Sequence, residues 1–427
     1  MSKKKFKAKV SKEMKMCYGT IAIPPKPVFK TREIPILILK KLCALMDEYT
    51  PTESNIKGGL FYGASGIGYT LVRCADYPLF EPIRERLLHK AKTYADASYE
   101  YTISHELPHI SLLLGKAGIY AVDAVVYKLL GFHPKARECL HLFHAQGAHC
   151  LVPDYSTDGG EDLWNGRAGY ITAALFLKKY FEEYFPTKYF YPYLEPMIKS
   201  CKEYAKKIHS TAPLAYSYYN TQCTGLLHGL GGILMIILCF PSYLDKHPGL
   251  DEEIKQTVDC ILLRQKSDGK FFPLMNSDVV IPGDVVKWRS GASGLLHLMA
   301  KAYLRWKHSR YLYSCMLIGD LIWNYGLEFL LTEGRNGSGL GLDHGLVGNL
   351  YGLLILYRLT KYPIYLQQAH SCSLVLKDEK YFKDLLHRDN VYSLFNGLSG
   401  IITYLLDTIN IEHAEFPCVH VFEFYEE

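Results

Sequence analysis

The sequence predicts an all-α fold, an α/α toroid in which seven outer helices surround seven inner helices. Two observations lead to this prediction. The motif Gly-x-x-Gly, followed by an apolar stretch, occurs seven times at intervals of 51 to 63 residues. Each interval is long enough for two helices of about 12–18 residues and their connections. One interval therefore corresponds to one inner and one outer helix.

The leading glycine of each motif is predicted to start an inner helix. A single Gly-x-x-Gly is uninformative, but seven at a nearly constant spacing indicate an internal repeat. The seven leading glycines are Gly63, Gly115, Gly166, Gly229, Gly291, Gly345 and Gly397.

The segments after and between the motifs differ in their hydrophobic pattern. Residues 229–240 are apolar almost all round, which requires burial on every side. Residues 34–49 and 81–94 are amphipathic, so one face can meet water. Buried helices that alternate with half-buried ones describe two concentric layers, closed into a ring so that no apolar end is exposed.

The two glycines of each motif are expected to have different tasks. The first permits a tight, non-standard backbone conformation before the helix. The second lies one turn later and has no side chain, so neighbouring inner helices can approach closely. If the inner helices are parallel, their N-termini meet at one mouth of the ring and favour anionic groups there.

Composition and length indicate a large globular protein. The chain has 427 residues, of which 49% are hydrophobic and 21% charged, and no apolar run is long enough to cross a bilayer. We assign residues 1–30 to a basic, disordered arm and residues 31–427 to a single toroid domain. The twelve cysteines include no C-x-x-C pair, which indicates reduced thiols and a cytoplasmic location.

The N-terminal arm carries most of the positive charge. Seven of its first 16 residues are lysines, against the single acid Glu13. Without an apolar segment it is not a secretory signal. It is either a solubilising tail or a weak attachment to nucleic acid or to an anionic membrane surface, and the last of these would place the protein at the membrane periphery.

Several motifs are more specific than Gly-x-x-Gly, and they resemble the LanC family, in particular the eukaryotic LanC-like proteins, over residues 62–417. These markers are Asn165-Gly-Arg-Ala-Gly-Tyr, Pro213-Leu-Ala-Tyr-Ser-Tyr-Tyr, His228-Gly-Leu-Gly-Gly, Trp288 ahead of Gly291-Ala-Ser-Gly, Ile322-Trp-Asn-Tyr-Gly-Leu, Leu342-Asp-His-Gly and Ser393-Leu-Phe-Asn-Gly.

The resemblance implies a toroid with one zinc ion at its central mouth, held by two cysteines and a histidine. It also implies addition of a thiol to dehydroalanine or dehydrobutyrine, which forms a thioether; in the eukaryotic relatives the thiol is glutathione. A fourth position open to the incoming thiol is the arrangement of a catalytic zinc, which lowers the pKa of that thiol.

At the matching positions of this sequence the implied zinc site is altered. Arg289 stands in the place of the first cysteine and Asp343 in the place of the second, so that only His344 is retained. Arginine stays protonated and cannot bind zinc. One histidine and one aspartate are too few for a stable catalytic zinc unless other groups converge. We therefore expect no bound zinc or other cofactor.

Four further positions follow from the resemblance. His228, in a His-Gly motif, is the candidate for proton transfer. Ser338 occupies the position of a lysine that contacts glutathione in the family, and Arg388 and Asp389 loosely match a basic–acidic segment near the glutathione contacts.

Two other clusters offer alternative sites. Cys139, His141, His144, His149 and Cys150 could bind a metal, but they fall between two inner helices, where structural roles in an outer helix are expected.

A run of carboxylates also precedes the third motif. Asp158, Glu161 and Asp162 could be the paired acids of a glycoside hydrolase, or they could cap the following helix.

A basic stretch could suggest nucleic acid, but no nucleic-acid-binding motif accompanies it. We interpret its side chains as the solvated face of an outer helix: Lys301, Arg305, Lys307 and Arg310.

Three functions remain open. The first is a zinc-free pseudoenzyme that binds a peptide or a thiol such as glutathione in its central cavity, or serves as a scaffold. The second is a residual glutathione transferase that acts on dehydroalanine or dehydrobutyrine. The third is an unrelated toroid hydrolase that uses Glu161 or Asp162.

The register of the motifs predicts which residues meet at the mouth. We expect a central cavity at the N-termini of the inner helices, in which both histidines are hydrogen-bonded. The resemblance implies that Arg289 and Asp343 occupy neighbouring positions of the family's zinc site, so they should form a direct ion pair beside His344, because a buried unpaired charge is expensive. The predicted lining residues are Tyr216, His228, Trp288, Arg289, Asp343 and His344.

Overall fold

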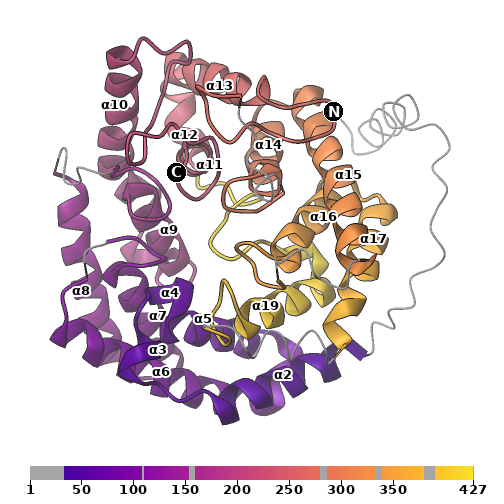
Figure 1. Ribbon diagram of the computed structural model, residues 1–427. Helices are drawn as coiled ribbons and strands as arrows, with labels where there is room; N and C mark the ends of the chain where they lie inside the picture. The colour runs from indigo at the N-terminus through magenta and orange to yellow at the C-terminus, as the bar shows by residue number, and fades with distance from the viewer. Residues whose placement is uncertain are drawn as a thin grey trace.

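The structure is a computed structural model that describes residues 33–107, 110–152, 159–278, 286–331, 339–378 and 390–426. Its described helices alternate along the chain between an outer and an inner layer of one ring (Figure 1). The predicted α/α toroid with seven inner and seven outer helices is confirmed. The outer helices are α2 (Ile34–Glu48), α6 (Arg84–Ser104), α8 (His133–Cys150), α10 (Tyr191–Lys207), α13 (Pro248–Leu262), α15 (Ser309–Leu331) and α17 (Pro363–Ser373).

Each inner helix begins immediately after the leading glycine of a motif, which is its N-cap residue. The inner helices are α5 (Ala64–Ala75), α7 (Lys116–Leu129), α9 (Arg167–Lys178), α11 (Leu230–Ile237), α14 (Ala292–Trp306), α16 (Leu346–Thr360) and α19 (Leu398–Ile409).

The ring is closed by contacts between its first and last helices. Every inner helix packs against the next one, and α19 packs against both α5 and α2. Arg73 on α5 pairs with the buried Asp407 on α19 at 2.7 Å, and Tyr351 on α16 donates to the same carboxylate at 2.7 Å. A buried carboxylate is costly unless it is hydrogen-bonded. Because the two partners of Asp407 come from two other inner helices, closure of the ring is what satisfies this charge.

Proline and glycine distinguish the two layers at their helix starts. Five outer helices (α2, α8, α10, α13 and α17) carry a proline at their first or second position, where the missing N–H costs nothing. The amphipathic stretch predicted at 81–94 begins three residues later, after the 3₁₀ turn η2 (Pro78–Ile83), and continues ten residues further as α6.

The motif glycines are required for space rather than for an unusual backbone. The leading glycines have extended backbone, with φ from −93° at Gly63 to −128° at Gly397, so the expected non-standard conformation is wrong. A Cβ at the second glycine of any motif would strike the carbonyl oxygen six residues earlier; at Gly118 it would lie 1.8 Å from Leu112 O. The second glycine therefore lets each helix pack closely on the loop that precedes it. The expected close approach to the neighbouring helix is not its main role.

The centre of the ring is filled by the C-terminal segment, residues 414–426, which we call the tail (Figure 1). Phe416 stacks on Trp288 with ring centroids 4.2 Å apart. Lys301, fully buried on the inner helix α14, donates to the carbonyl oxygen of His420 at 2.8 Å. The expectation that Lys301 lies on a solvated outer face is therefore wrong, because the tail supplies carbonyl acceptors inside the ring.

The predicted outer-helix position is also wrong for Arg305 and Lys307, because both belong to the end of the inner helix α14, where Lys307 is the left-handed C-cap residue. Only Arg310 lies on an outer helix, α15. Arg305 pairs with Asp245 at 2.6 Å, and Arg310 pairs with Asp259 at 2.6 Å.

Within the described residues, no helix is both long and apolar enough to cross a membrane. All the cysteines described there are free thiols. The lysine-rich arm lies outside the described residues, so membrane contact by the arm stays a prediction.

An uncompensated carboxylate lies inside the wall of the ring. Asp123 on α7 is fully buried, and neither of its oxygens has a hydrogen-bond partner among the described residues. Burial, reinforced by the charge of Asp96, raises the pKa of Asp123 well above its usual value. The carboxyl group is therefore neutral at acidic pH in the folded chain and opposes folding once it must ionise.

Gly118→Ala should lower the free energy of unfolding by about 1–3 kcal/mol, because its Cβ has no room beside the Leu112 carbonyl. The matched control is Gly68→Ala on α5, where the nearest contact of a Cβ is Val122 Cγ1 at 3.5 Å. That change should be neutral or stabilise by up to about 1 kcal/mol. Urea denaturation measures both, and equal losses would contradict the packing argument.

Asp123→Asn should flatten the dependence of stability on pH. Because the pKa of Asp123 is raised in the folded state, the wild type loses stability as pH rises from the unfolded pKa of about 3.9 through the folded pKa. The variant lacks this loss, so its stability relative to wild type should increase from pH 4 toward neutral pH. Thermal denaturation across this range tests it; a constant difference would refute the assignment.

Candidate functional site

The loops that precede the inner helices are hydrogen-bonded to one another at one end of the ring, which we call the mouth. The backbone N–H of Leu227 donates to Arg289 O at 3.1 Å, and that of Leu342 donates to Phe395 O at 2.7 Å. The N–H of Phe61 donates to Leu113 O at 3.0 Å. These lateral bonds hold the residues just before each leading glycine in a common register, so that their side chains meet at the mouth.

The guanidinium of Arg289 is the centre of the candidate site. Its Nε lies 3.3 Å from Asp343 Oδ1, one Nη lies 3.1 Å from His344 Nε2, and the other lies 3.4 Å from His228 Nε2. Asp343 is completely buried, whereas the Arg289 side chain is 24% exposed. The predicted ion pair and the predicted hydrogen bonding of both histidines are confirmed.

The arginine determines the tautomer of both histidines. A guanidinium only donates hydrogen bonds, so each Nε2 that faces Arg289 must accept and carries no proton. His344 therefore bears its proton on Nδ1, which lies 2.6 Å from Asp343 Oδ2. In this arrangement each imidazole accepts a hydrogen bond from the guanidinium, and the Asp343 carboxylate faces both Arg289 and His344.

Aromatic rings form the wall of the site on the side of α9. The imidazole of His228 stacks on Tyr218 at 4.6 Å and meets Trp164 edge-on at 5.1 Å. The Arg289 guanidinium lies over Trp164, with Cζ 5.6 Å from the ring centroid. His228 Nδ1 faces Asp162 Oδ2 at 3.8 Å, too far for a direct hydrogen bond.

Sequence reasoning missed Trp164 and Tyr218 as site residues. Trp164 stands two positions before its leading glycine, as Arg289 and Asp343 do before theirs. Aligning the seven motifs by register would have found it. Tyr218 lies in the long loop before α11, within the marker that begins at Pro213, but only Tyr216 of that marker was expected at the mouth.

Two of the predicted lining residues are almost completely buried. Trp288 is 1% exposed and belongs to the core, where it packs on Phe416 and Phe395. Tyr216 is buried; this burial, with the charge of Asp162, raises the pKa of its hydroxyl. Of the positions expected near glutathione, Ser338, Arg388 and Asp389 all lie outside the described residues.

The carboxylates before α9 do not form a free acid pair. Arg167, itself buried, donates to Glu161 and also to the carbonyl oxygens of Cys150 and Val152. Burial raises the pKa of Glu161.

Asp162 Oδ1 accepts the backbone N–H of Asn165 at 2.8 Å and so stabilises the turn before α9. The first N–H groups of α9 donate to the backbone carbonyl oxygens of residues 160–162 and not to a carboxylate, so the predicted side-chain cap of the helix is wrong. Asp158 lies outside the described residues.

The cysteines and histidines of α8 have structural roles. Cys139 and Cys150 are buried, and His144 stacks on Phe185 and shares a hydrogen bond with Tyr189 at 3.0 Å. Within the described part of the chain, the five side chains predicted as an alternative metal cluster do not bring three ligand atoms together.

Comparison with known proteins places the ring among the LanC relatives. The family described as "Lanthionine synthetase C-like protein" matches residues 80–421. "Glutathione S-transferase LANCL1" of Danio rerio is 28% identical over 319 residues, which cover 73% of this chain and 74% of the relative. "LanC-like protein GCL1" of Arabidopsis thaliana is 27% identical over 398 residues, 86% of this chain and 85% of the relative.

A solved structure shares the architecture. "Nisin cyclase" superposes with a TM-score of 0.57 over 90% of this chain and 94% of its own, at 13% sequence identity. This likeness establishes the α/α toroid fold.

Arg289→Ala should destabilise the protein by about 2 kcal/mol, because it leaves the buried Asp343 carboxylate without its cation. Arg289→Ala combined with Asp343→Ala should cost less, since the stranded charge is gone. The control is Arg86→Ala, which removes a pair of side chains 61% and 65% exposed and should have no measurable effect. Urea denaturation of all four proteins provides the test; a double variant less stable than Arg289→Ala would refute it.

Proposed function

Because this chain belongs to the lanthionine synthetase C-like family, we propose that it uses the family's toroid to bind a peptide or a small thiol such as glutathione at the mouth. Relatives with this fold are named as enzymes, a glutathione S-transferase and a cyclase. In this member, we infer, the zinc-dependent addition of a thiol has been lost. The unrelated hydrolase hypothesis is abandoned, because the family match and the pairing of Glu161 with Arg167 contradict it.

The observation that carries the proposal is the position of the Arg289 guanidinium among Asp343, His344 and His228. The Nε2 lone pair of each histidine is directed at this cation, and the Asp343 carboxylate is shared between Arg289 and His344. A zinc ion needs three or four protein ligands with free lone pairs. The residues present do not fit zinc, because a permanent cation already uses the donors that remain.

The mouth retains features of a binding site. Trp164 and Tyr218 are half-buried, and a quarter of Arg289 is exposed beside them. Asn165 Oδ1 and Ser290 Oγ are buried without a hydrogen-bond partner among the described residues. An apolar group of a peptide could rest on the rings while its amides satisfy these polar atoms.

A second candidate function is thiol addition without a metal, and the Asp343–His344 contact of 2.6 Å favours it. A carboxylate that orients an imidazole is the usual arrangement for a general base. Arg289 would stabilise a thiolate or an enolate electrostatically, and His228 would return the proton. Both roles require Arg289 to release the two Nε2 atoms.

The two candidates differ in metal content and in turnover. We expect purified wild-type protein to contain no stoichiometric zinc and to add no glutathione to a dehydroalanine peptide, as measured by metal analysis and mass spectrometry. Replacing both lost ligand positions, Arg289→Cys with Asp343→Cys, should restore about one zinc per chain, because two thiolates and His344 then form an open zinc site. Cobalt substitution would show the thiolate charge-transfer absorption.

Wild-type addition of glutathione with no bound metal would select the second candidate, and Arg289→Gln should then abolish it. About one zinc in the wild type, lost in His344→Gln, would refute both. Binding itself is tested by tryptophan fluorescence: glutathione or a dehydroalanine peptide should perturb Trp164, and Trp164→Phe removes that signal.

A further inference from the structure

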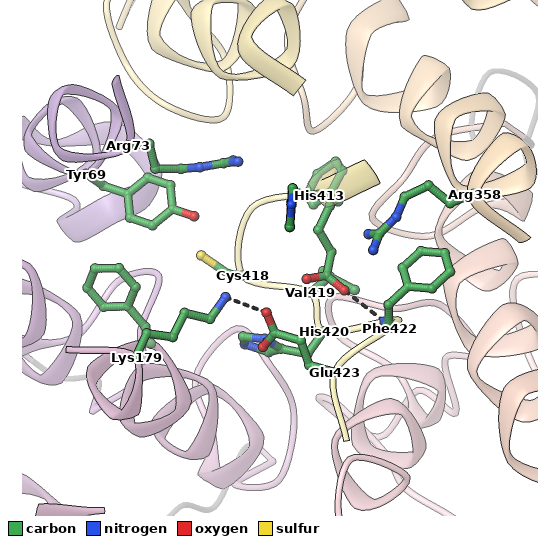
Figure 2. A pocket seen from close by; sticks show the side chains of 13 residues that line it. Tyr69, Arg73, Lys179, Arg358, His413, Cys418, Val419, His420, Phe422 and Glu423 are labelled. Atoms are coloured by element: carbon green, nitrogen blue, oxygen red, sulfur yellow. Dashed lines mark hydrogen bonds and ion pairs between the residues drawn. The ribbon is translucent and has the colours of Figure 1, made fainter. Parts of the chain in front are cut away.

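A cavity of about 360 Å³ lies at the opposite end of the ring from the mouth, where the inner helices end. It is bounded by Arg73 of α5, Lys179 at the end of α9, Arg358 of α16 and the tail (Figure 2). The stacked rings of Phe416 and Trp288 fill the centre of the ring between this cavity and the mouth. Its chemistry is therefore separate from that of Arg289 and His344.

The tail presents three potential metal ligands to this cavity. One ligand atom each from Glu415, His420 and Glu423 lies within 4.8 Å of the other two. Ligands of a single ion at 2.0–2.2 Å lie about 3–4.4 Å apart, so the cluster requires only a small contraction. We propose that Glu415, His420 and Glu423 bind one divalent transition-metal ion.

Contacts within the ring hold this cluster in place. Buried Lys301 fixes the carbonyl oxygen of His420 at 2.8 Å. The backbone N–H of Phe422 donates to Glu415 Oε1 at 2.9 Å. His420 Nδ1 lies 2.9 Å from Glu423 Oε2. A hydrogen bond between an imidazole and a carboxylate is the expected state of two such ligands before an ion separates them, and the fixed backbone reduces the entropy lost on binding.

The charges of the cavity compensate the two carboxylates unequally. Burial is outweighed by the hydrogen bond from His420 and the charge of Lys179, which lower the pKa of Glu423, whereas Glu415 is less well compensated. Burial, together with the charge of Glu423, raises the pKa of Glu415. The Nζ of Lys179 pairs with Glu423 Oε1 at 2.7 Å, and the buried Lys301 lies beside the cluster, where it donates to the backbone carbonyl oxygens of His420 and Glu423. The Lys179 side chain is 44% exposed, so it can turn to solvent when an ion arrives. A dication between two carboxylates is then favoured over a single ammonium.

Among the described residues neither arginine of the cavity forms an ion pair with the cluster, although the charge of Arg358 acts on Glu415. Arg73 is held by Asp407 at 2.7 Å. Arg358 donates to Ala414 O at 2.7 Å and lies over the Phe422 ring at 3.7 Å. Tyr425 donates to Glu423 Oε2, which orients the carboxylate and supports it as a ligand.

The donor set indicates which ions fit. One imidazole and two carboxylates suit Mn²⁺, Fe²⁺ or Zn²⁺, whereas Mg²⁺ and Ca²⁺ prefer oxygen ligands alone. The adjoining cavity has room for the water molecules that would complete the coordination. Mn²⁺ is the best probe, because it binds weakly to the free thiols of this chain.

Electron paramagnetic resonance of full-length protein titrated with Mn²⁺ tests the proposal. We expect about one saturable site per chain, with nitrogen hyperfine coupling from His420. Glu423→Gln and His420→Gln should each weaken Mn²⁺ binding about tenfold or more, because each removes a ligand. His420→Gln should also remove the nitrogen coupling. Lys179→Met is the matched opposite change: it removes the competing ammonium and should tighten binding.

The mouth variant His344→Gln should bind Mn²⁺ as the wild type does. If His344→Gln abolishes binding, the ion sits at the mouth, and both this inference and the zinc-free mouth are wrong. No saturable binding in either the wild type or Lys179→Met, or unchanged binding in the folded Glu423→Gln and His420→Gln proteins, overturns the tail site alone. Circular dichroism confirms that each variant is folded.

Discussion

The contact between the second glycine of each motif and the carbonyl oxygen six residues earlier is the constraint on which the toroid depends. With a Cβ at Gly118 only 1.8 Å from Leu112 O, no other residue lets the helix start rest directly on its loop. The loops so positioned bond laterally to their neighbours, and the ring acquires a rigid rim of backbone. The side chains one or two positions before each leading glycine take no part in this backbone packing. The chemistry of the mouth can therefore change, as at Arg289 and Asp343, while the frame is preserved.

The Arg289 network does for the frame what a bound ion would do, because it connects three loops through one cationic centre. The difference is chemical. A guanidinium offers only donors and no vacant coordination position, so it orders Asp343 and the two histidines by charge and hydrogen bonds alone. The partial exposure of Arg289 also limits the desolvation cost that a fully buried pair would bear. In this fold the geometry of the mouth can thus be held by an ion pair and hydrogen bonds.

The sequence was sufficient for the ring and for much of the mouth, because both follow from register. Seven motifs at similar spacing located every inner helix, and the positions before the glycines brought Arg289, Asp343 and His344 together. The sequence did not predict the contacts made by the tail. Residues 414–426 have no periodicity, so nothing indicated that they enter the ring, that Trp288 packs on Phe416, or that Lys301 is buried with carbonyl partners. The spatial reason for the glycines was missed as well, since backbone crowding leaves no trace in composition.

Closure of the ring has a consequence for the order of folding. Arg73 and its partner Asp407 are 334 positions apart, and the first outer helix packs against the last inner one. During synthesis α2 and α5 must wait, with apolar faces uncovered, until α19 has been made. Contacts so distant in sequence are slow to form, and the waiting intermediate is prone to aggregate. The toroid therefore forms only after all seven repeats have been synthesised, and the tail then packs inside the closed ring.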